Sequence, residues 1–377
     1  MKALGICSEG FEKAAAIEIN EITGKETVEE LGGVSFEAEN NEEIAELCYR
    51  AQSLHKVMLV LGEFNTDNLE DNLGEKIKKT DFGSWLNGTF RVNVYHEKEL
   101  DVSGMDLAAK AGEFIINKTN AKADMENPKV IVLVYIHGQK GYFGIDFAGI
   151  TLSKRDYKIY NVPSSLNAST AYCLLRMAGW APGKIVLDPM CGSGIIPIEA
   201  GLSYAKKPPH FHIKDKLAFT RFMDFDFSAV DKEAVENDKK IGREAKLHCA
   251  DHLLAALRAT KNNAKIADID RIISATKIDL EWLETKYDEK FFDFIITHPP
   301  SISKYSNVKE LEKMYNEFFY QAEYILKDDG IVAVLANSSD GFLKACENNK
   351  FQMISENQVW QGKHKFSLMI FKKQNSD

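Results

Sequence analysis

Apolar runs and helical patterns alternate regularly through the second half of the chain. Runs such as Lys184–Leu187 and Phe292–Ile296 have the length and composition of buried strands, and the segments between the runs carry apolar residues at helical spacing. The strands expected from such runs are 184–187, 247–250, 271–275, 292–296 and 331–335, with 351–354 and 366–371 as a hairpin-like edge. This alternation predicts an α/β domain with a doubly wound, mostly parallel sheet and a final antiparallel strand.

The first half of the chain has shorter elements of both kinds. The elements expected there are helices at 11–19, 41–48 and 106–118 and strands at 89–95, 129–137 and 141–147. These patterns divide the chain into one α+β unit (1–62), a second α+β unit (63–159), a linker and helix (160–180) and the α/β domain (181–377).

The composition is that of a globular protein without a membrane-spanning segment. The chain has 377 residues, 45% of them hydrophobic, and no apolar stretch reaches the roughly 20 residues that a membrane helix needs. The six cysteines are far apart and lack nearby histidines, so neither a zinc site nor a disulfide framework is expected. The first residues lack the pattern of a secretory signal, which favours a cytoplasmic location. Because the formal net charge is −9, any nucleic-acid partner requires a local patch.

The segment Leu187–Ala200, with the sequence LDPMCGSGIIPIEA, has the strand, turn and helix start of a cofactor-binding loop. Asp188 is expected at the end of the strand, at the edge where open α/β sheets bind ligands. Gly192 and Gly194 permit a tight turn and a close approach of ligand to backbone, and the amides of the next helix point toward that ligand. An ordinary tight turn is the alternative, but the complete order of strand, carboxylate, glycines and helix favours binding.

Acidic residues after the following strands are candidates for the rest of this site. A carboxylate at the end of the second strand accepts hydrogen bonds from both hydroxyls of a ribose, and both Asp251 and Asp231 suit that position. Asp251 is preferred because a clearer apolar stretch precedes it. Asp279 follows the third strand, where its carboxylate can accept a hydrogen bond from an adenine amino group, although the role of helix N-cap suits it equally.

A proline-rich loop follows the fourth strand of the predicted sheet, and the paired prolines make it rigid. Its residues are Thr297, His298, Pro299, Pro300 and Ser301. With this loop and the segment Leu187–Ala200, the second half of the chain resembles a Rossmann-type S-adenosylmethionine-dependent methyltransferase. The resemblance is to the guanine-N2 RNA methyltransferases that carry a THUMP domain.

The resemblance covers nearly the whole chain. The first unit is similar to the family's ferredoxin-like domain, and residues 81–86 and 146–157 look like a THUMP domain with its typical ending. Residues 222–226 (FMDFD) are similar to an insertion in the enzymes that modify guanosine 6 of tRNA, which favours that subgroup over the position-10 enzymes. The resemblance implies S-adenosyl-L-methionine as the cofactor, RNA as the partner with tRNA favoured, and no metal; we expect a monomer.

The resemblance also implies site residues. Those for the cofactor are Asp188, Pro189, Cys191, Gly192, Gly194, Asp251 and Asp279, and those for catalysis are His298, Pro299, Pro300 and Ser301. In the family, an Asp or Asn before the two prolines accepts hydrogen bonds from the guanine amine, and an aromatic residue after them stacks on the flipped base. Here His298 replaces the carboxylate or amide, and Ser301 replaces the aromatic residue.

Three readings of this altered loop stay open. In the first reading the protein is an active enzyme. The neutral imidazole of His298 accepts one hydrogen bond and, with an ordinary pKa of about 6.5, can act as a base. A backbone carbonyl near Pro299 accepts a hydrogen bond from the guanine amine, and Tyr305 or another aromatic residue stacks on the base from a shifted position. Alternatively, the protein is an inactive, S-adenosylmethionine-liganded RNA-binding protein. The third reading is methylation of another atom or another RNA.

Charge gives a weaker indication of an RNA surface. Residues 61–160 contain 13 Lys and Arg against 15 Asp and Glu, so the THUMP-like unit is not a basic module. The candidates for a phosphate-facing patch are Lys110, Lys118, Lys122, Lys140, Lys154, Arg155 and Lys158. Each is equally well explained as a solvated surface side chain. Residues 206–212, with two lysines and two histidines, are a further candidate edge.

Overall fold

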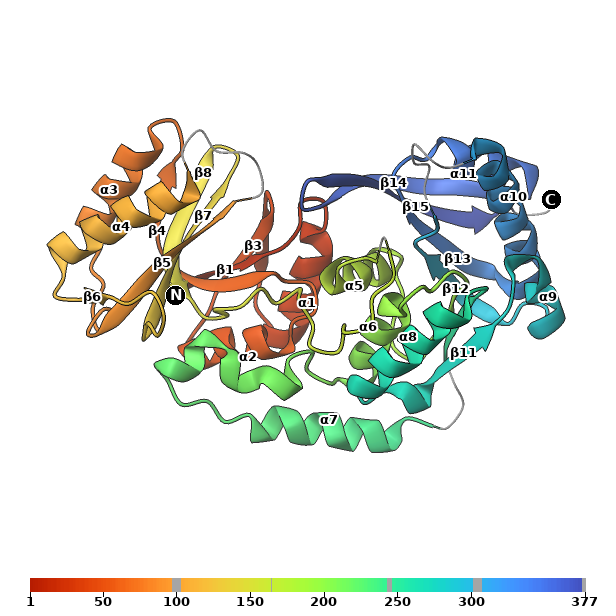
Figure 1. Cartoon of the computed structure of the whole chain (residues 1–377), viewed down its shortest axis with the longest axis horizontal. Helices are drawn as coiled ribbons and strands as arrows, with labels where there is room; N and C mark the ends of the chain where they lie inside the picture. The colour runs from red at the N-terminus through yellow and green to blue at the C-terminus, as the bar shows by residue number, and fades with distance from the viewer. Residues whose placement is uncertain (97–102, 164, 243–245, 301–306, 375–377) are drawn as a thin grey trace. The chain divides into compact units, whose positions relative to one another are not determined.

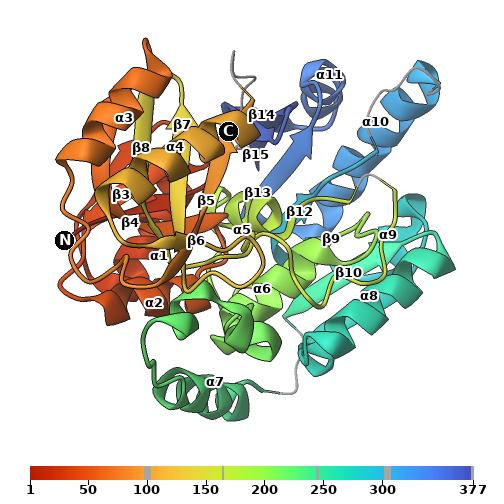
Figure 2. The ribbon, with the colours of Figure 1, turned by 60° about the vertical axis from the view of Figure 1, so that its left-hand side comes forward.

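The structure, a computed structural model, describes residues 1–96, 103–163, 165–242, 246–300 and 307–374. It divides into two compact units (Figures 1 and 2). The first unit consists of residues 1–152 and 210–227, and the second of residues 153–209 and 228–377.

The first unit is a mixed sheet with helices. Its strands are β1 (Lys2–Ile6), β2 (Thr27–Glu30), β3 (Gly33–Glu37), β4 (Lys56–Asn65), β5 (Thr89–His96), β6 (Lys122–Ala123), β7 (Val130–His137) and β8 (Lys140–Asp146). Its helices are α1 (Glu12–Thr23), α2 (Asn41–Arg50), α3 (Leu69–Lys79) and α4 (Gly104–Lys118), with the 3₁₀ turns η1 (Phe211–Lys216) and η2 (Ala218–Arg221). The strand order is β2-β3-β1-β4-β8-β7-β5-β6. The helices and strands expected in this half are present, whereas α3 is not predicted by the sequence pattern.

Strand β4 joins the two α+β units that the sequence predicts. It pairs antiparallel with β1 on one side and with β8 on the other, so a single sheet runs through both. A buried ion pair lies at this junction, where Lys56 Nζ is 2.7 Å from Asp146 Oδ2 and the Asp146 side chain is 0% exposed. Asp146 Oδ1 also accepts hydrogen bonds from the backbone N–H groups of Ala148 and Gly149.

The segment 210–227 leaves the second half of the chain and packs within the first unit. The backbone N–H of Phe219 donates to the carbonyl of Phe147 at 3.0 Å. The Phe222 ring packs edge-on against Trp85, with 5.3 Å between the ring centroids. The FMDFD stretch therefore contributes an aromatic residue to the packing of the THUMP-like unit.

The second unit is an α/β sheet. Its strands are β9 (Val186–Asp188), β10 (Leu247–Asp251), β11 (Ile273–Lys277), β12 (Phe292–Thr297), β13 (Leu326–Ala336), β14 (Phe351–Gln361) and β15 (His364–Lys373). Its helices are α5 (Ala168–Met177), α6 (Ile195–Ala205), α7 (Ser228–Lys240), α8 (Leu254–Ile266), α9 (Leu283–Lys286), α10 (Val308–Ile325) and α11 (Asp340–Asn348), with the 3₁₀ turns η3 (Asp270–Ile272) and η4 (Leu280–Trp282).

The strand order of this sheet is β11-β10-β9-β12-β13-β15-β14. Strands β9 to β13 pair in parallel, and β15 is antiparallel to both of its neighbours. This confirms the predicted doubly wound sheet with a final antiparallel strand. Some bounds differ from those predicted. Strand β13 begins at Leu326 instead of 331 and contains a bulge, because its pairing with β12 skips from Leu326 to Ile331. Strand β14 continues past 354 to Gln361 because it pairs with β15 along its length.

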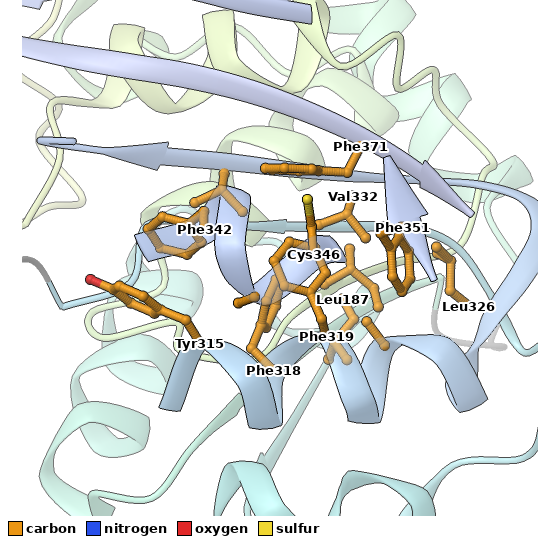
Figure 3. Packing of buried hydrophobic residues seen from close by; sticks show 14 of the residues in the cluster. Leu187, Tyr315, Phe318, Phe319, Leu326, Val332, Phe342, Cys346, Phe351 and Phe371 are labelled. Atoms are coloured by element: carbon orange, nitrogen blue, oxygen red, sulfur yellow. The ribbon is translucent and has the colours of Figure 1, made fainter. Parts of the chain in front are cut away.

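Helices cover both faces of this sheet. On one face, Phe318 and Phe319 of α10 point toward the strands, and Phe319 lies 5.0 Å from the ring of Phe371 (Figure 3). Ala250 of β10 belongs to the same buried cluster, whereas its neighbour Cys249 packs with Leu257 of α8. Because successive side chains of a strand point to opposite faces, α8 covers the other face.

The ion pair at the β4–β8 junction makes a testable contribution to stability. Replacing Lys56 by methionine should lower the free energy of unfolding by about 3–5 kcal/mol, because the Asp146 carboxylate stays buried without its counter-charge. Urea unfolding of the whole chain measures this loss. The double variant Lys56→Met/Asp146→Asn removes both charges and should recover most of the stability. A single variant as stable as the wild type would contradict this account of the junction.

Candidate cofactor and substrate site

The loop after β9 requires glycine at two positions. Gly192 and Gly194 have φ angles of +54° and +80°, in the left-handed region that favours glycine. A Cβ on Gly194 would lie 2.5 Å from Cγ2 of Thr260, and one on Gly192 would lie 3.0 Å from Cγ2 of Val162. Gly194 is also the N-cap residue of α6, so the loop ends at free backbone amides. These are the properties expected of a loop that holds a ligand against its backbone.

Asp251 holds this loop from the end of the neighbouring strand β10. Its Oδ2 accepts a hydrogen bond from the backbone N–H of Gly192 at 3.0 Å, and its Oδ1 accepts one from Leu253 at 2.9 Å. Asp231 lies within α7, because residues 228–230 begin that helix instead of ending a strand. The structure thus brings Asp251, rather than Asp231, to the glycine loop.

Asp188 connects the ends of β9 and β12. Its Oδ1 accepts a hydrogen bond from Thr297 Oγ1 at 2.7 Å and another from the backbone N–H of Met190 at 3.2 Å. Burial raises the pKa of Asp188 to about 7, because the cost of burying a charge outweighs these two hydrogen bonds. The loop with the two glycines and the loop with the two prolines are therefore joined through one buried carboxyl group.

Two buried polar residues of α8 fix the glycine loop from behind. Thr260 Oγ1 donates to the Gly192 carbonyl at 2.9 Å, and Asn263 Nδ2 donates to the Ser193 carbonyl at 3.1 Å. Asn263 also exchanges two hydrogen bonds with the backbone of Tyr160 in the linker. The sequence pattern predicts this helix but not these roles. Polar residues three positions apart on the buried face of an amphipathic helix are the signal for them.

A cavity of about 1310 Å³ lies at these strand ends. It is lined by the predicted residues Asp188, Pro189, Cys191, Gly192, Asp251, Asp279, His298, Pro299 and Pro300, together with the linker residues Asn161, Val162, Pro163 and Ser165. Asp279 has the N-cap position of η4, but its side chain makes no capping hydrogen bond. The volume exceeds the roughly 300–1,000 Å³ of a single small-molecule site, so there is room for a cofactor and a nucleobase.

The ring of His298 is fixed by its surroundings. Nδ1 lies 2.6 Å from the carbonyl oxygen of Leu335 on β13, and the ring packs edge-on against Phe366 at 5.6 Å. A carbonyl oxygen only accepts, so Nδ1 carries the proton of this bond. Burial lowers the pKa of His298 below 6.5, so the ring is neutral near pH 7 and Nε2 is an acceptor.

The rest of the proline loop is anchored at Pro300, whose carbonyl accepts a hydrogen bond from the Tyr315 hydroxyl at 3.0 Å. Tyr315 itself stacks on Phe342, with 3.9 Å between the ring centroids. The predicted site residue Ser301 and the candidate stacking residue Tyr305 lie outside the described residues.

The predicted RNA-binding lysines of the first unit differ in their surroundings. Lys118 and Lys122 line one hollow together. Lys110 and Lys140 each form an ion pair with a glutamate, which offsets part of their charge. Of these four, Lys118 and Lys122 are brought to a shared surface feature.

Three further residues predicted to bind RNA, Lys154, Arg155 and Lys158, lie near the linker. The structure corrects this prediction for two of them. The side chain of Arg155 is 0% exposed and forms a two-pronged ion pair with Glu199, at 3.1 Å for each bond. Lys158 donates to the carbonyl of Leu166 at 2.6 Å, and burial lowers the pKa of its ammonium group. The side chains of Arg155 and Lys158 therefore bond to groups within the second unit instead of facing RNA, whereas Lys154 is exposed.

The strand order, the glycine loop after β9 and the acid at the end of β10 define a Rossmann-type methyltransferase. Residues 155–366 match the RMKL-like methyltransferase domain, and residues 68–146 match the THUMP domain. The chain belongs to the family of RMKL-like methyltransferase domains. In the part of the chain that the structure describes, no group of three or more His, Cys, Asp or Glu side chains could hold a metal ion, and no helix is long and apolar enough to cross a membrane.

Relatives and solved structures match along nearly the whole chain. The tRNA (guanine(6)-N2)-methyltransferase of Methanocaldococcus jannaschii is 30% identical over 94% of this chain and 95% of its own. The protein of the same name from Archaeoglobus fulgidus is 26% identical, over 96% and 90%. TrmN from Thermus thermophilus has a TM-score of 0.72 at 20% identity over 99% of both chains. SMU.472, solved in complex with SAH, has a TM-score of 0.80 at 19% identity over 100% of this chain and 99% of its own, and these two structures show a shared fold.

The contact between Gly194 and Thr260 predicts a specific loss of cofactor binding. Gly194→Ala should weaken the binding of S-adenosylhomocysteine at least roughly tenfold, because the new Cβ displaces the loop from α8. Titration calorimetry measures this change. Gly183→Ala is the matched control, since Gly183 also has a left-handed φ of +92° but, among the described residues other than its chain neighbours, no atom lies within 4 Å of its Cβ position. Equal affinities of the two variants would contradict the role given to this contact.

Proposed function

We propose that this protein transfers a methyl group from S-adenosylmethionine to N2 of a guanosine in tRNA. The proposal rests on one observation above all, the single cavity that the glycine loop, Asp251 and His298 line together. It is supported by two relatives named for this reaction, which align with nearly the whole chain, and by the THUMP match. The same names favour guanosine 6 as the target.

The residues of the cavity suit S-adenosylmethionine, which supplies an electrophilic methyl group when bound. Each carboxylate oxygen of Asp251 has a second lone pair, and these suit the two ribose hydroxyls. The Asp279 carboxylate, which makes no capping bond, suits an adenine amino group. Apolar side chains of Leu253 and Ile278 line the same region and suit the adenine ring.

His298 supplies the acceptor that the family's Asp or Asn supplies elsewhere. The guanine amine is a poor nucleophile because its lone pair is delocalised into the ring. With Nδ1 bound to Leu335, the neutral imidazole presents the lone pair of Nε2, which accepts a hydrogen bond from the amine and orients it. The same nitrogen can take up the proton that the amine loses.

An inactive RNA-binding protein is the less favoured alternative. The relatives that align with nearly the whole chain are named as enzymes, and the neutral ring of His298 retains an acceptor nitrogen. Methylation of another RNA, or of another atom, remains an outcome that product analysis distinguishes. Action on tRNA fits the cytoplasmic location that we expect.

The reaction and the role of His298 are tested together. Incubation with labelled S-adenosylmethionine and unmodified tRNA should give N2-methylguanosine, identified by nuclease digestion and mass spectrometry. His298→Phe fills the site without an acceptor and should lower kcat about 10²-fold or more, whereas His298→Asn restores an acceptor and should stay within roughly tenfold of wild type. Equal losses in the two variants would contradict the acceptor role.

The pH dependence of kcat gives an independent check on the same nitrogen. Protonation converts Nε2 into a donor, so wild-type activity should fall as pH decreases through the pKa of His298, which lies below 6.5. Asp188, with a pKa of about 7, titrates in wild type and variants alike. In His298→Asn, the loss of activity below pH 6.5 that His298 causes should therefore disappear. A variant profile identical to wild type would show that another group causes that loss.

A further inference from the structure

The hairpin formed by β14 and β15 extends past the end of the strand beside it. Pairing between β13 and β15 ends at Ala336 and Ser367, whereas β14 and β15 remain paired up to Gln361 and His364. Strand β13 runs parallel to β12, so its carboxyl end lies at the edge where β12 delivers His298. The turn of the hairpin therefore projects at the edge of the sheet that carries the candidate site.

Contacts hold this end of the hairpin against the cavity. Gln361, His364 and Phe366 line the same cavity as His298, and Phe366 packs against the His298 ring. The side chain of Gln361 accepts a hydrogen bond from the backbone N–H of Asn167 at 2.7 Å, which ties the hairpin to the segment before α5. The turn is thus a fixed part of the rim of the site.

The hairpin turn is basic in a protein that is acidic as a whole. The formal net charge of the chain is −9, yet residues 357–374 contain four lysines and no Asp or Glu. Lys363, His364 and Lys365 are exposed at the turn. Lys365 lies over the ring of Trp360, with its Nζ 5.5 Å from the ring centroid, which orients the ammonium group.

We propose that the turn of this hairpin, residues 361–365, binds phosphates of the RNA strand next to the nucleotide whose base enters the cavity. The inference rests on the proposed function, since it assigns a contact of that same substrate. A base in the cavity brings its own backbone phosphates to the rim, where the side chains of Lys363, His364 and Lys365 are exposed. An acidic protein partner is the alternative outcome of the test.

The test compares two pairs of lysines in the full-length protein. The first variant is Lys363→Gln/Lys365→Gln, and the matched control is Lys239→Gln/Lys240→Gln, which removes the same charge from exposed positions in the last turn of α7. Binding of unmodified tRNA is measured across a range of salt concentrations, together with KM, kcat and the affinity for S-adenosylhomocysteine.

The hairpin variant should bind tRNA roughly tenfold more weakly near 0.1 M salt, and the slope of log affinity against log salt should decrease by roughly 1.5. Its KM for tRNA should rise while kcat at saturating tRNA and the affinity for S-adenosylhomocysteine stay within about twofold, which also shows that it is folded. The control variant should keep the wild-type values.

Wild-type binding and salt dependence in the hairpin variant would overturn the inference, and so would an equal loss in the control. If RNA binding is unchanged but the variant no longer binds an acidic protein partner, the turn is a protein-binding site and the RNA inference is overturned. Failure of the wild type to methylate any RNA would instead contradict the proposed function. The two failures are distinguishable because tRNA binding is measured without turnover.

Discussion

The parallel alignment of β9, β10 and β12 determines where the candidate functional residues lie. Each strand ends at the same edge of the sheet, and each contributes a polar group there, namely Asp188, Asp251 and Thr297 with the loop that follows it. The hydrogen bond from Thr297 to Asp188 joins the loop proposed to hold the cofactor to the loop proposed to face the substrate. Movement of either loop would shift the position of the other. The residues proposed for cofactor binding and those proposed for catalysis therefore depend on the same strand ends.

The altered proline loop is consistent with the chemistry that the family needs. An acceptor for the amine does not have to be a carboxylate or an amide if a neutral ring presents one lone pair in a fixed direction. The Leu335 carbonyl fixes the proton of His298 on Nδ1, and burial keeps the ring neutral, so in the proposed mechanism the backbone of β13 compensates for the change of residue. Sequence alone cannot show this, because the partner is a backbone atom of another strand.

The fold and the cofactor loop were predictable because their signals are local. Apolar runs reveal strands, and the segment Leu187–Ala200 contains its strand, glycines and helix within fourteen residues. Features that depend on distant contacts were not predictable. Arg155 looks like a surface charge until the fold places Glu199 beside it, and Asn263 looks like an ordinary helical residue until the loop carbonyls meet it. The length of the β14–β15 hairpin likewise follows from pairing, not from the apolar pattern of either strand.

The central claim is that the cavity at these strand ends holds the nucleoside of the cofactor with Asp251 at its ribose. A crystal structure of the complex with S-adenosylhomocysteine tests it most directly. The account predicts both ribose hydroxyls within hydrogen-bond distance of the Asp251 carboxylate, with the adenine amino group near Asp279. A ligand bound elsewhere, or a ribose held by Asp231, would contradict it.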